Sequence, residues 1–274
     1  MSTIFDQMVI LGNGVQMPQF GLGTYKMTEP KQTMQAVEKA VSLGYRAIDT
    51  ASIYENEQVV GEAIRNTGIA REDLFVTSKV WNDEQGYDET LRAFERSLTR
   101  LDMNYLDLYL THWPVTGSYV DTYRAIERLY DEKLIRATGV SNHHEAHLRE
   151  IFAIANIRPM VNQIEVHPRL TQEPLRQFCS EHQIAVTSWS PLARGQILED
   201  ATLMAIAAQH GKTVAQVIIR WHIQNGLIVI PKSISFDRIK ENSEIVDFEL
   251  TLSDMALINA LNQDERTGQN PDSF

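Results

Sequence analysis

The sequence has a single cysteine, no long apolar run and no excess of positive charge. Cys179 alone cannot form an intrachain disulfide, and a lone cysteine is typical of proteins from reducing compartments. No apolar stretch approaches the roughly 20 residues that a membrane-spanning helix needs. The formal net charge of −11 disfavours binding to nucleic acid or to an anionic membrane surface, because both attract basic patches.

Export signals, interdomain linkers and repeats are also absent from the sequence. The first residues contain no basic region followed by a long apolar stretch, so we expect no signal peptide and a cytoplasmic protein. No segment is rich enough in proline, glycine and serine to separate two domains. The 274 residues, 43% of them apolar, therefore predict one domain that spans residues 1–274 and has a sizeable core.

What the sequence does contain is an alternation of short apolar runs with longer amphipathic stretches. Residues 7–19 predict a β-hairpin that turns at Asn13-Gly14, since both residues tolerate positive φ. The runs that follow are rich in Val, Ile, Leu and aromatic residues and are mostly too short for helices. We therefore predict eight strands, at 20–23, 45–48, 74–78, 106–111, 135–140, 160–162, 184–188 and 227–230.

Helix-like stretches separate these strands. The clearest places five side chains on one face at helical spacing, namely Tyr87, Leu91, Phe94, Leu98 and Leu101. Two more stretches, 213–225 and 252–261, depart from strict alternation. The pattern favours an α/β protein with a (β/α)8 TIM barrel, an N-terminal hairpin and two extra helices. An open doubly wound sheet is disfavoured, because the phosphate turn it would carry after its first strand lacks the third glycine here.

Polar or aromatic side chains stand where seven of these strands end. In a barrel, the carboxyl ends of the strands and the loops after them form the active face. Each residue alone has an ordinary structural interpretation, such as an ion pair between Asp49 and Lys79. Together they predict one polar mouth, formed by Asp49, Lys79, His112, Ser141-Asn142, Gln163, Trp189-Ser190 and Lys232-Ser233.

Tyr54, on the loop after the second strand, supplies a chemical hypothesis. A free tyrosine has a pKa of about 10, and a nearby Lys79 cation would lower it by stabilising the phenolate. Asp49 would keep Lys79 charged, and His112 would donate a second hydrogen bond to a carbonyl oxygen. The four residues predict an acid and an oxyanion site for a carbonyl group that receives hydride.

A series of motifs follows in order along nearly the whole chain. The motifs are Gly21-Leu22-Gly23-Thr24-Tyr25, Asp49-Thr50-Ala51, Tyr54-Glu55-Asn56-Glu57, Ser78-Lys79-Val80-Trp81, Thr111-His112-Trp113-Pro114, Gly139-Val140-Ser141-Asn142, Val161-Asn162-Gln163-Ile164-Glu165 and Ile230-Pro231-Lys232-Ser233. In this order they resemble the aldo-keto reductase family. The short loops after Pro114 and Trp189, and the short tail, are most similar to microbial members of the 2,5-diketo-D-gluconate reductase type.

The resemblance implies a catalytic tetrad and NADPH bound in extended form across the mouth. The tetrad is Asp49, Tyr54, Lys79 and His112. The implied cofactor contacts are Ser141, Asn142 and Gln163 at the carboxamide, Trp189 at the nicotinamide ring, Lys232, Ser233 and Arg238 at the 2′-phosphate, Asn242 at the adenine, and also Gly23, Thr24, Ser190 and Leu192. Candidate walls of the substrate pocket are Tyr25, Trp81, His112, Trp113 and Phe274.

Two functions follow from the resemblance. The first is NADPH-dependent reduction of aldehydes, 2-oxo-aldehydes or keto-sugars to alcohols by a monomer, with Tyr54 as general acid. The alternative is a nicotinamide-binding barrel that acts as a regulatory or interaction subunit. A metal-dependent barrel hydrolase is disfavoured, because the sequence shows no cluster of carboxylate and histidine ligands.

One departure from the family pattern lies after Ser141-Asn142, where an aromatic residue is common and this chain has His143. His144 and His147 follow, which raises the question of a metal site. No glutamate or cysteine at a useful spacing offers a third ligand, so we expect no metal. We expect these histidines to form a solvated helix start, and we expect the polar tail, 262–274, to lie over the surface.

Overall fold

The structure is a computed structural model that describes residues 3–274. Eight parallel strands form one sheet in the order β10-β9-β8-β7-β6-β5-β4-β3. Their bounds are β3 Leu22–Gly23, β4 Ala47–Asp49, β5 Phe75–Val80, β6 Leu106–Thr111, β7 Ile135–Ser141, β8 Val161–Glu165, β9 Ala185–Trp189 and β10 Ile228–Val229. A parallel bridge between Phe20 and Val229 joins the first strand region to the last. The predicted barrel is confirmed.

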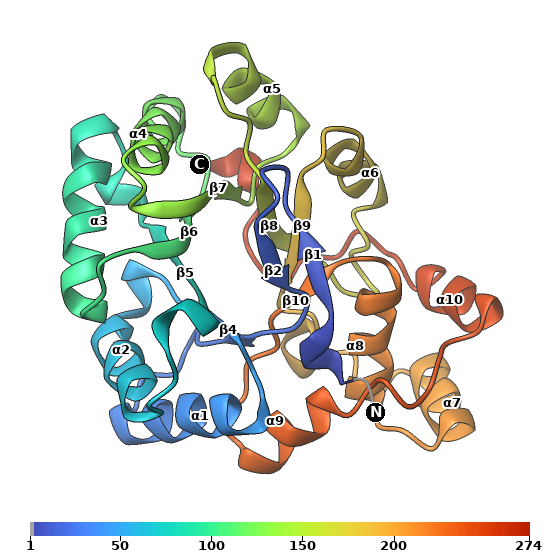
Figure 1. The fold of residues 1–274 in the computed structure, drawn as a ribbon. Coiled ribbons are helices and arrows are strands. Elements are labelled where there is room, and N and C mark those ends of the chain that lie inside the picture. The colour runs from blue at the N-terminus through green and yellow to red at the C-terminus, as the bar shows by residue number, and fades with distance from the viewer. Residues whose placement is uncertain (1–2) are drawn as a thin grey trace.

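Helices surround the strands (Figure 1). Their bounds are α1 Pro30–Leu43, α2 Glu57–Asn66, α3 Tyr87–Leu101, α4 Tyr119–Asp131, α5 Glu145–Ile154, α6 Glu173–Glu181, α7 Ala201–His210, α8 Val214–Gln224, α9 Phe236–Ser243 and α10 Leu252–Asn259. Two helices lie between β9 and β10 and two more follow β10, which agrees with the extra helices predicted at 213–225 and 252–261. Of the helices in this described part of the chain, none combines the length and apolarity that a bilayer crossing requires.

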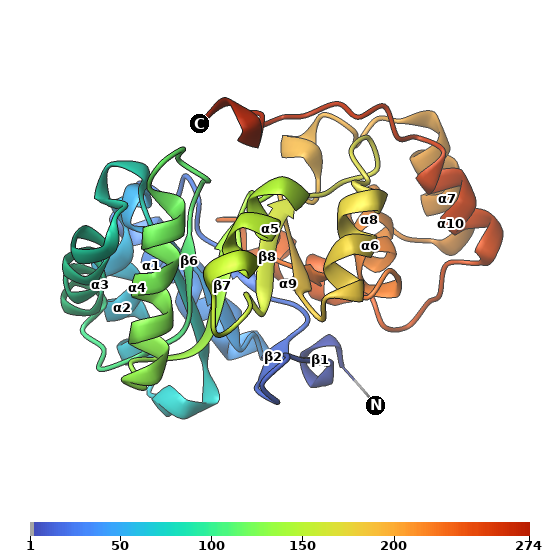
Figure 2. The same cartoon turned by 90° about the horizontal axis from the view of Figure 1, so that it is seen from above.

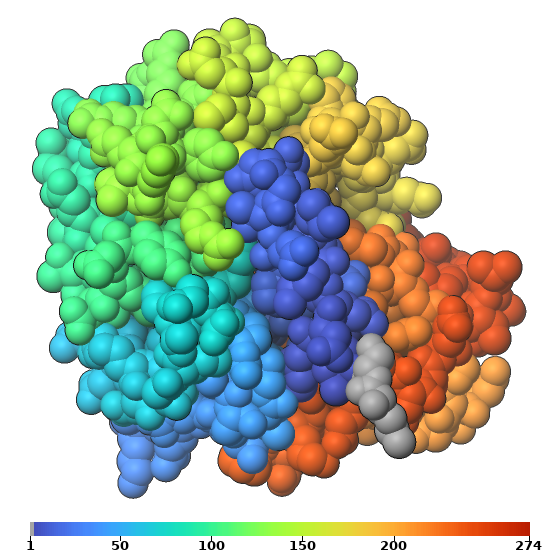
Figure 3. Space-filling view, viewed as in Figure 1, coloured from blue at the N-terminus to red at the C-terminus, as the bar shows by residue number. Residues whose placement is uncertain are grey.

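The predicted N-terminal hairpin is also present. Strand β1, Met8–Ile10, pairs antiparallel with β2, Gln16–Pro18. The hairpin lies across one end of the barrel (Figure 3), and Figure 2 shows the C-terminal segment at the opposite end. Only Gly14 of the turn has positive φ. Asn13 instead donates from Nδ2 to the Arg136 carbonyl at 2.9 Å, so its side chain ties the turn to the barrel.

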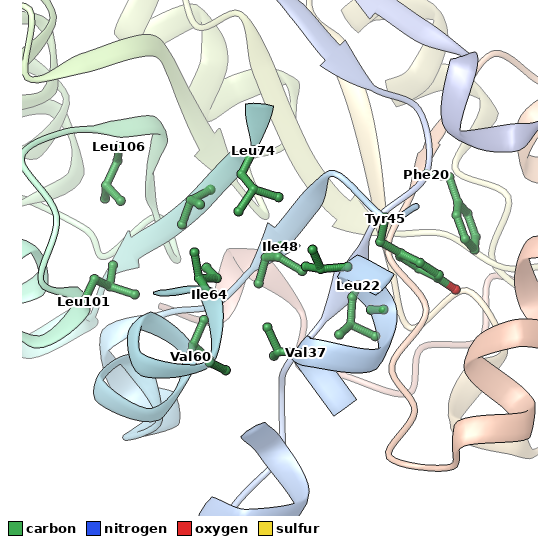
Figure 4. Packing of buried hydrophobic residues seen from close by; sticks show 14 of the residues in the cluster. Phe20, Leu22, Val37, Tyr45, Ile48, Val60, Ile64, Leu74, Leu101 and Leu106 are labelled. Atoms are coloured by element: carbon green, nitrogen blue, oxygen red, sulfur yellow. The ribbon is translucent and has the colours of Figure 1, made fainter. Parts of the chain in front are cut away.

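Amphipathic helices bury their apolar faces against the outside of the strands. Figure 4 shows Val37 of α1 and Val60 and Ile64 of α2 packed around Ile48 of β4. In α3 the predicted face is partly confirmed, since Phe94 and Leu101 are buried, whereas Tyr87 at the helix start is 37% exposed. Because these contacts fix the strands from outside, side chains at the strand ends are held in a rigid frame.

Left-handed backbone gathers at the carboxyl end of the barrel. Such φ values are uncommon for residues other than glycine, and they concentrate at functional sites. Those on loops that follow barrel strands are Lys26, Glu55, Asn142, Gln172, Ser190, Ala193 and Arg194. The strained loops thus surround the end at which the sequence predicts a polar mouth.

Candidate active site

A cavity of about 1120 Å³ opens at the carboxyl end of the barrel. Most of the predicted site residues line it: Gly23, Tyr25, Asp49, Tyr54, Trp81, His112, Trp113, Ser141, Asn142, Gln163, Trp189, Ser190, Leu192, Lys232, Ser233, Arg238 and Asn242. Two others lie beneath the surface. Lys79 is fully buried, and Thr24 does not reach the cavity, because its hydroxyl donates to the Asp49 carbonyl at 2.9 Å.

Lys79 is the centre of a buried polar chain under the cavity. Its Nζ donates to Asp49 Oδ1 at 2.6 Å, to the Thr50 carbonyl at 2.9 Å and to the Tyr54 hydroxyl at 3.4 Å. The second Asp49 oxygen accepts from Gln163 Nε2 at 2.7 Å. These contacts satisfy all three ammonium donors and hold the ammonium below the hydroxyl of Tyr54.

Asn56 positions the loop that carries Tyr54. This buried side chain accepts from the Thr50 hydroxyl at 2.7 Å and donates to the carbonyls of Thr24 and Met27 at 3.0 and 3.2 Å. It therefore joins the loop after β4 to the loop after β3. Tyr54 itself ends a short 3-10 turn, Ser52–Tyr54, and its phenol is the only group of that turn that contacts Lys79 in the described residues.

His112 follows β6 and completes the floor of the cavity. Its ring packs edge-on against Trp81 at 5.0 Å and against Tyr54 at 5.8 Å between centroids. Nδ1 is buried without a partner among the described residues. A buried N–H without an acceptor is costly, so we assign the ring proton to Nε2, which is left to donate into the cavity.

The electrostatics of the floor favour neutral side chains at the surface of the cavity. Burial, and then repulsion from Asp49 and Tyr25, raises the pKa of Tyr54 well above 10.0. Burial and the Lys79 charge lower the pKa of His112 well below 6.5. The expected net fall in the pKa of Tyr54 is therefore wrong for this site. A cation 3.4 Å from the hydroxyl still favours the phenolate, but burial and the Asp49 charge outweigh it. Lys79 lies closer to Asp49 than to Tyr54, and burial penalises the phenolate.

Next to this floor, a second polar group links three strand ends. Asn142, in the left-handed conformation, donates from Nδ2 to the His112 carbonyl at 2.9 Å. Its Oδ1 accepts from the Trp189 indole at 2.8 Å. Ser141 Oγ donates to the Gln163 carbonyl at 2.8 Å. The residues predicted to contact a carboxamide are thus brought together, and they fix the Trp189 ring at the wall of the cavity.

The far end of the cavity is cationic. Lys26, Lys232 and Arg238 all line it, and within residues 3–274 none of them forms an ion pair. Burial, and then repulsion from Lys26, lowers the pKa of Lys232. Three cations that form no ion pair in the described residues could attract an anion, and a guanidinium can hold a phosphate through two parallel hydrogen bonds.

Several residues lie differently from the sequence-based expectation. Strands β5 and β8 continue past Lys79 and Gln163, to Val80 and Glu165, so both side chains project from within a strand. His143 is fully buried and hydrogen-bonds through Nδ1 to the Ser141 carbonyl at 2.8 Å, so the expected solvated helix start was wrong at this position. Nowhere in the described chain do three or more His, Cys, Asp or Glu side chains gather as metal ligands would.

Some lining residues escaped the sequence analysis. Six of them are Lys26, Ile53, Arg194, Thr267, Gly268 and Gln269. Lys26 and Ile53 could have been found, because each adjoins a residue already chosen for the site. The other four could not, because their place depends on how the loop after β9 and the C-terminal segment fold across the mouth.

Comparisons with known proteins agree with this architecture. The Aldo/keto reductase family model matches residues 18–263. Glyoxal reductase of Bacillus subtilis (strain 168) is 54% identical over 274 residues, 100% of this chain and 99% of that protein. Methylglyoxal reductase DkgA of Yersinia pestis is 43% identical over 97% of each chain.

Solved structures are similar over the same extent. A crystal structure of a Gox0644 mutant in complex with NADPH has a TM-score of 0.94 and 42% identity, covering 100% of this chain and 99% of that one. The Bombyx mori aldo-keto reductase AKR2E4 in complex with NADP has a TM-score of 0.91 and 37% identity, covering 97% and 96%. The chain belongs to the aldo/keto reductase family and is an oxidoreductase.

Proposed function

We propose that the protein reduces small aldehydes and 2-oxo-aldehydes to alcohols with NADPH, and that Tyr54 is the general acid. The observation that carries the proposal is the buried chain from Asp49 through Lys79 to the Tyr54 hydroxyl, beside a neutral His112. Two relatives, a glyoxal reductase and a methylglyoxal reductase, support the substrate class. Reduction of keto-sugars stays a prediction.

Asp49, Tyr54, Lys79 and His112 at the floor of the cavity each have a separate role in the proton transfer. The Tyr54 hydroxyl donates its proton to the carbonyl oxygen as negative charge develops there. Nε2–H of His112 donates a hydrogen bond to the same oxygen. The Lys79 ammonium then stabilises the Tyr54 phenolate until it regains a proton from solvent, and Asp49 keeps that ammonium charged and oriented.

The cavity fits an extended dinucleotide phosphate. Lys26, Lys232 and Arg238 offer charges that form no ion pair within the described residues, although Glu241 also lines the cavity, and such charges suit a phosphate dianion. At the other end, the amides of Asn142 and Gln163 suit a carboxamide. The predicted contacts that line the cavity and would hold NADPH, together with Lys26, are Gly23, Ser141, Asn142, Gln163, Trp189, Ser190, Leu192, Lys232, Ser233, Arg238 and Asn242. When bound, NADPH supplies the hydride that reduces the carbonyl carbon.

The proposal is tested by NADPH oxidation with methylglyoxal, measured as a function of pH. Because the pKa of Tyr54 is raised above 10.0 and that of His112 is lowered below 6.5, both groups keep one protonation state between these values. We expect kcat to vary by less than about twofold from about pH 7 to about pH 9. A kcat that falls steeply as the pH rises past 7 would contradict a neutral His112.

The same assay separates an enzyme from a regulatory subunit. A subunit that only senses the cofactor would bind NADPH equally well with and without aldehydes. It would oxidise none of the bound NADPH. Titration of NADPH against the protein, followed by intrinsic fluorescence, measures binding independently of turnover. Binding without oxidation across a panel of aldehydes would overturn the proposed activity and leave the cofactor assignment standing.

Replacing Arg238 by alanine is expected to weaken NADPH about tenfold to a hundredfold, because a charge-assisted hydrogen bond contributes roughly 1.5–3 kcal/mol. NADH lacks the 2′-phosphate, so its Kd should change much less. Lys240→Ala is the matched control. Lys240 lies on the same helix, α9, and pairs with Glu244 at 2.6 Å, away from the cavity. Equal weakening of NADPH and NADH would refute the phosphate assignment.

A further inference from the structure

The C-terminal segment, residues 266–274, forms part of the wall of the cavity. We expected the tail to lie over the surface. Figure 2 shows it crossing the carboxyl end of the barrel, above the strands. Thr267, Gly268 and Gln269 line the cavity, and the Phe274 ring stacks on Trp113 at 4.5 Å with an interplanar angle of 23°. The segment therefore contributes residues to a site that the barrel alone would leave more open.

Glu165, the last residue of β8, holds the near end of this segment. One carboxylate oxygen accepts the backbone N–H of Thr267 at 2.7 Å and also its hydroxyl. The other accepts the backbone N–H of Gly268 at 3.2 Å. The Glu165 side chain is fully buried, and its one other side-chain partner is His167 at 3.3 Å. Most of its donors thus come from a segment about 100 residues later in the chain.

A buried carboxylate needs such donors. Burial works against the ionised form, but hydrogen bonds from His167 and Thr267 outweigh it and hold the pKa of Glu165 below its ordinary value. Within residues 3–274 no lysine or arginine pairs with it. Detaching the segment would leave this charge without its main donors, which is costly in the interior. The ionised Glu165 carboxylate is therefore stable only while residues 267–268 stay in place.

The segment presses on Trp189. A Cβ added at Gly268 would overlap the ring of Trp189, so glycine is needed for the backbone to lie this close. Trp189 is fixed from the other side by its hydrogen bond to Asn142. The hydrogen bond between Gly268 and Glu165 therefore fixes the backbone that packs against one face of the Trp189 ring.

The far end of the segment has a weaker attachment. Asp272 pairs with His144 at 2.7 Å, but its side chain is 56% exposed, and exposed pairs contribute little. The Thr116 hydroxyl donates to the Phe274 carbonyl at 2.6 Å, also in an exposed setting. The attachment at Glu165 is buried, whereas the one at the far end is exposed, so the Glu165 attachment contributes more to holding the segment in place.

We propose that Glu165 is a positioning residue that fastens residues 266–274 against Trp189 and thereby completes the substrate pocket. It touches neither substrate nor cofactor and acts through Thr267 and Gly268. The inference rests on the proposed carbonyl reduction only for its kinetic readout. Loss of the attachment should raise KM for the aldehyde, because the far wall and the Phe274–Trp113 stack are no longer held, while the proton donors under the cavity stay in place.

The test compares Glu165→Gln with Glu265→Gln. Glutamine keeps the shape but removes the charge and places amide donors against the N–H groups of residues 267 and 268. Glu265 immediately precedes the segment, and within residues 3–274 its only ion pair is with Arg169 at 3.5 Å, at the surface. We expect E165Q to raise KM for methylglyoxal about tenfold, because the hydrogen bonds that hold the segment are made to a charged acceptor and are therefore among the stronger ones. Its kcat should stay within about twofold, and E265Q should match the natural protein.

Hydrogen exchange gives a second readout that does not need turnover. Amides of residues 266–274 should exchange faster in E165Q than in E265Q, while the amides of β4 to β6 should not. Unchanged exchange of the segment together with an unchanged KM would overturn the inference. If no aldehyde is reduced even by the natural protein, the proposed function fails, and exchange alone still decides whether Glu165 holds the segment.

Two further variants keep the test decisive. Gly268→Ala displaces the same segment from Trp189, so E165Q and Gly268→Ala should be non-additive in KM; independent, additive effects would contradict a shared mechanism. If E165Q does not fold, Thr267→Val replaces it, because it removes only the hydroxyl donor. Faster exchange and a higher KM in Thr267→Val support the inference, and natural values of both overturn it.

Discussion

Replacing Tyr54 by phenylalanine is expected to lower kcat for aldehyde reduction by about 10²–10⁴-fold, the usual contribution of a positioned proton donor. The change removes one oxygen atom, whose only hydrogen bond in the described structure is to Lys79 at 3.4 Å. The ring keeps its packing against Tyr25 and His112. Because the phenol is not needed to hold the cofactor, the Kd for NADPH should stay within about threefold, well under 1.4 kcal/mol.

The measurements are steady-state kinetics with methylglyoxal and a fluorescence titration with NADPH. Tyr87→Phe is the matched control, because Tyr87 lies on α3 with 37% of its surface exposed and outside the cavity. It should keep the natural kcat and Kd. Near-normal turnover of Tyr54→Phe would show that another group, or water, delivers the proton.

Lys79→Met is expected to lower both stability and activity. Lys79 and Asp49 form a buried pair at 2.6 Å, with side chains 0% and 7% exposed. Removing one partner of a buried pair costs roughly 3–5 kcal/mol, because the other charge stays uncompensated. Activity should fall by about 10²–10³-fold, as when a transition-state charge loses its stabilising group. Denaturant unfolding measures the first effect and kcat measures the second.

A second substitution separates the two effects. Lys79→Met combined with Asp49→Asn removes both charges, so the free energy of unfolding should recover most of the loss, since a neutral pair does not carry the desolvation cost. Activity should not recover, because the phenolate of Tyr54 still lacks its cation. A surface ion pair contributes less than about 1 kcal/mol. If Lys79→Met lowered the free energy of unfolding by no more than that, the Lys79–Asp49 pair would be solvated and would not form a buried polar chain.

The fold was predictable because its signals are local and repeated. Each short apolar run between amphipathic stretches is weak evidence, but eight in alternation permit few architectures. The floor of the site was predictable for a related reason. Parallel strands that end at one face bring the residues at and next to their ends together wherever the loops go. Asp49, Lys79 and His112 could therefore be grouped at one end of the barrel without knowledge of the loops.

What the sequence did not reveal depends on distant contacts. The polar composition of 262–274 indicated a surface segment, and all of its residues except Pro271 are at least partly exposed. That composition did not reveal that the N–H groups of Thr267 and Gly268 bind a carboxylate on β8. The type of residue suggested that His143 is solvated, but its ring is enclosed against Tyr119 and His147. The rise in the pKa of Tyr54 comes from burial, which only the assembled mouth produces. In each case the local pattern is compatible with either outcome.

The barrel closes where β3 meets β10, and a ligand bound at this joint could stabilise the whole sheet. The shortest strands, β3 and β10, meet there through hydrogen bonds such as Gly21 N to Val229 O at 3.0 Å and Gly23 N to Pro231 O at 3.3 Å. Lys26 follows one of these strands and Lys232 follows the other, so the free protein places two like charges across its thinnest contact.

An anion held by both lysines would remove that repulsion at the joint itself. The first and last strands of the barrel are the barrel strands farthest apart in sequence, and only a few hydrogen bonds join them. A ligand that contacts both strands would add a further link between them. Ligand binding would then stabilise the closure of the ring as a whole rather than one loop. The proposed phosphate end of the cavity would then contribute to the stability of the closed barrel as well as to recognition of the ligand.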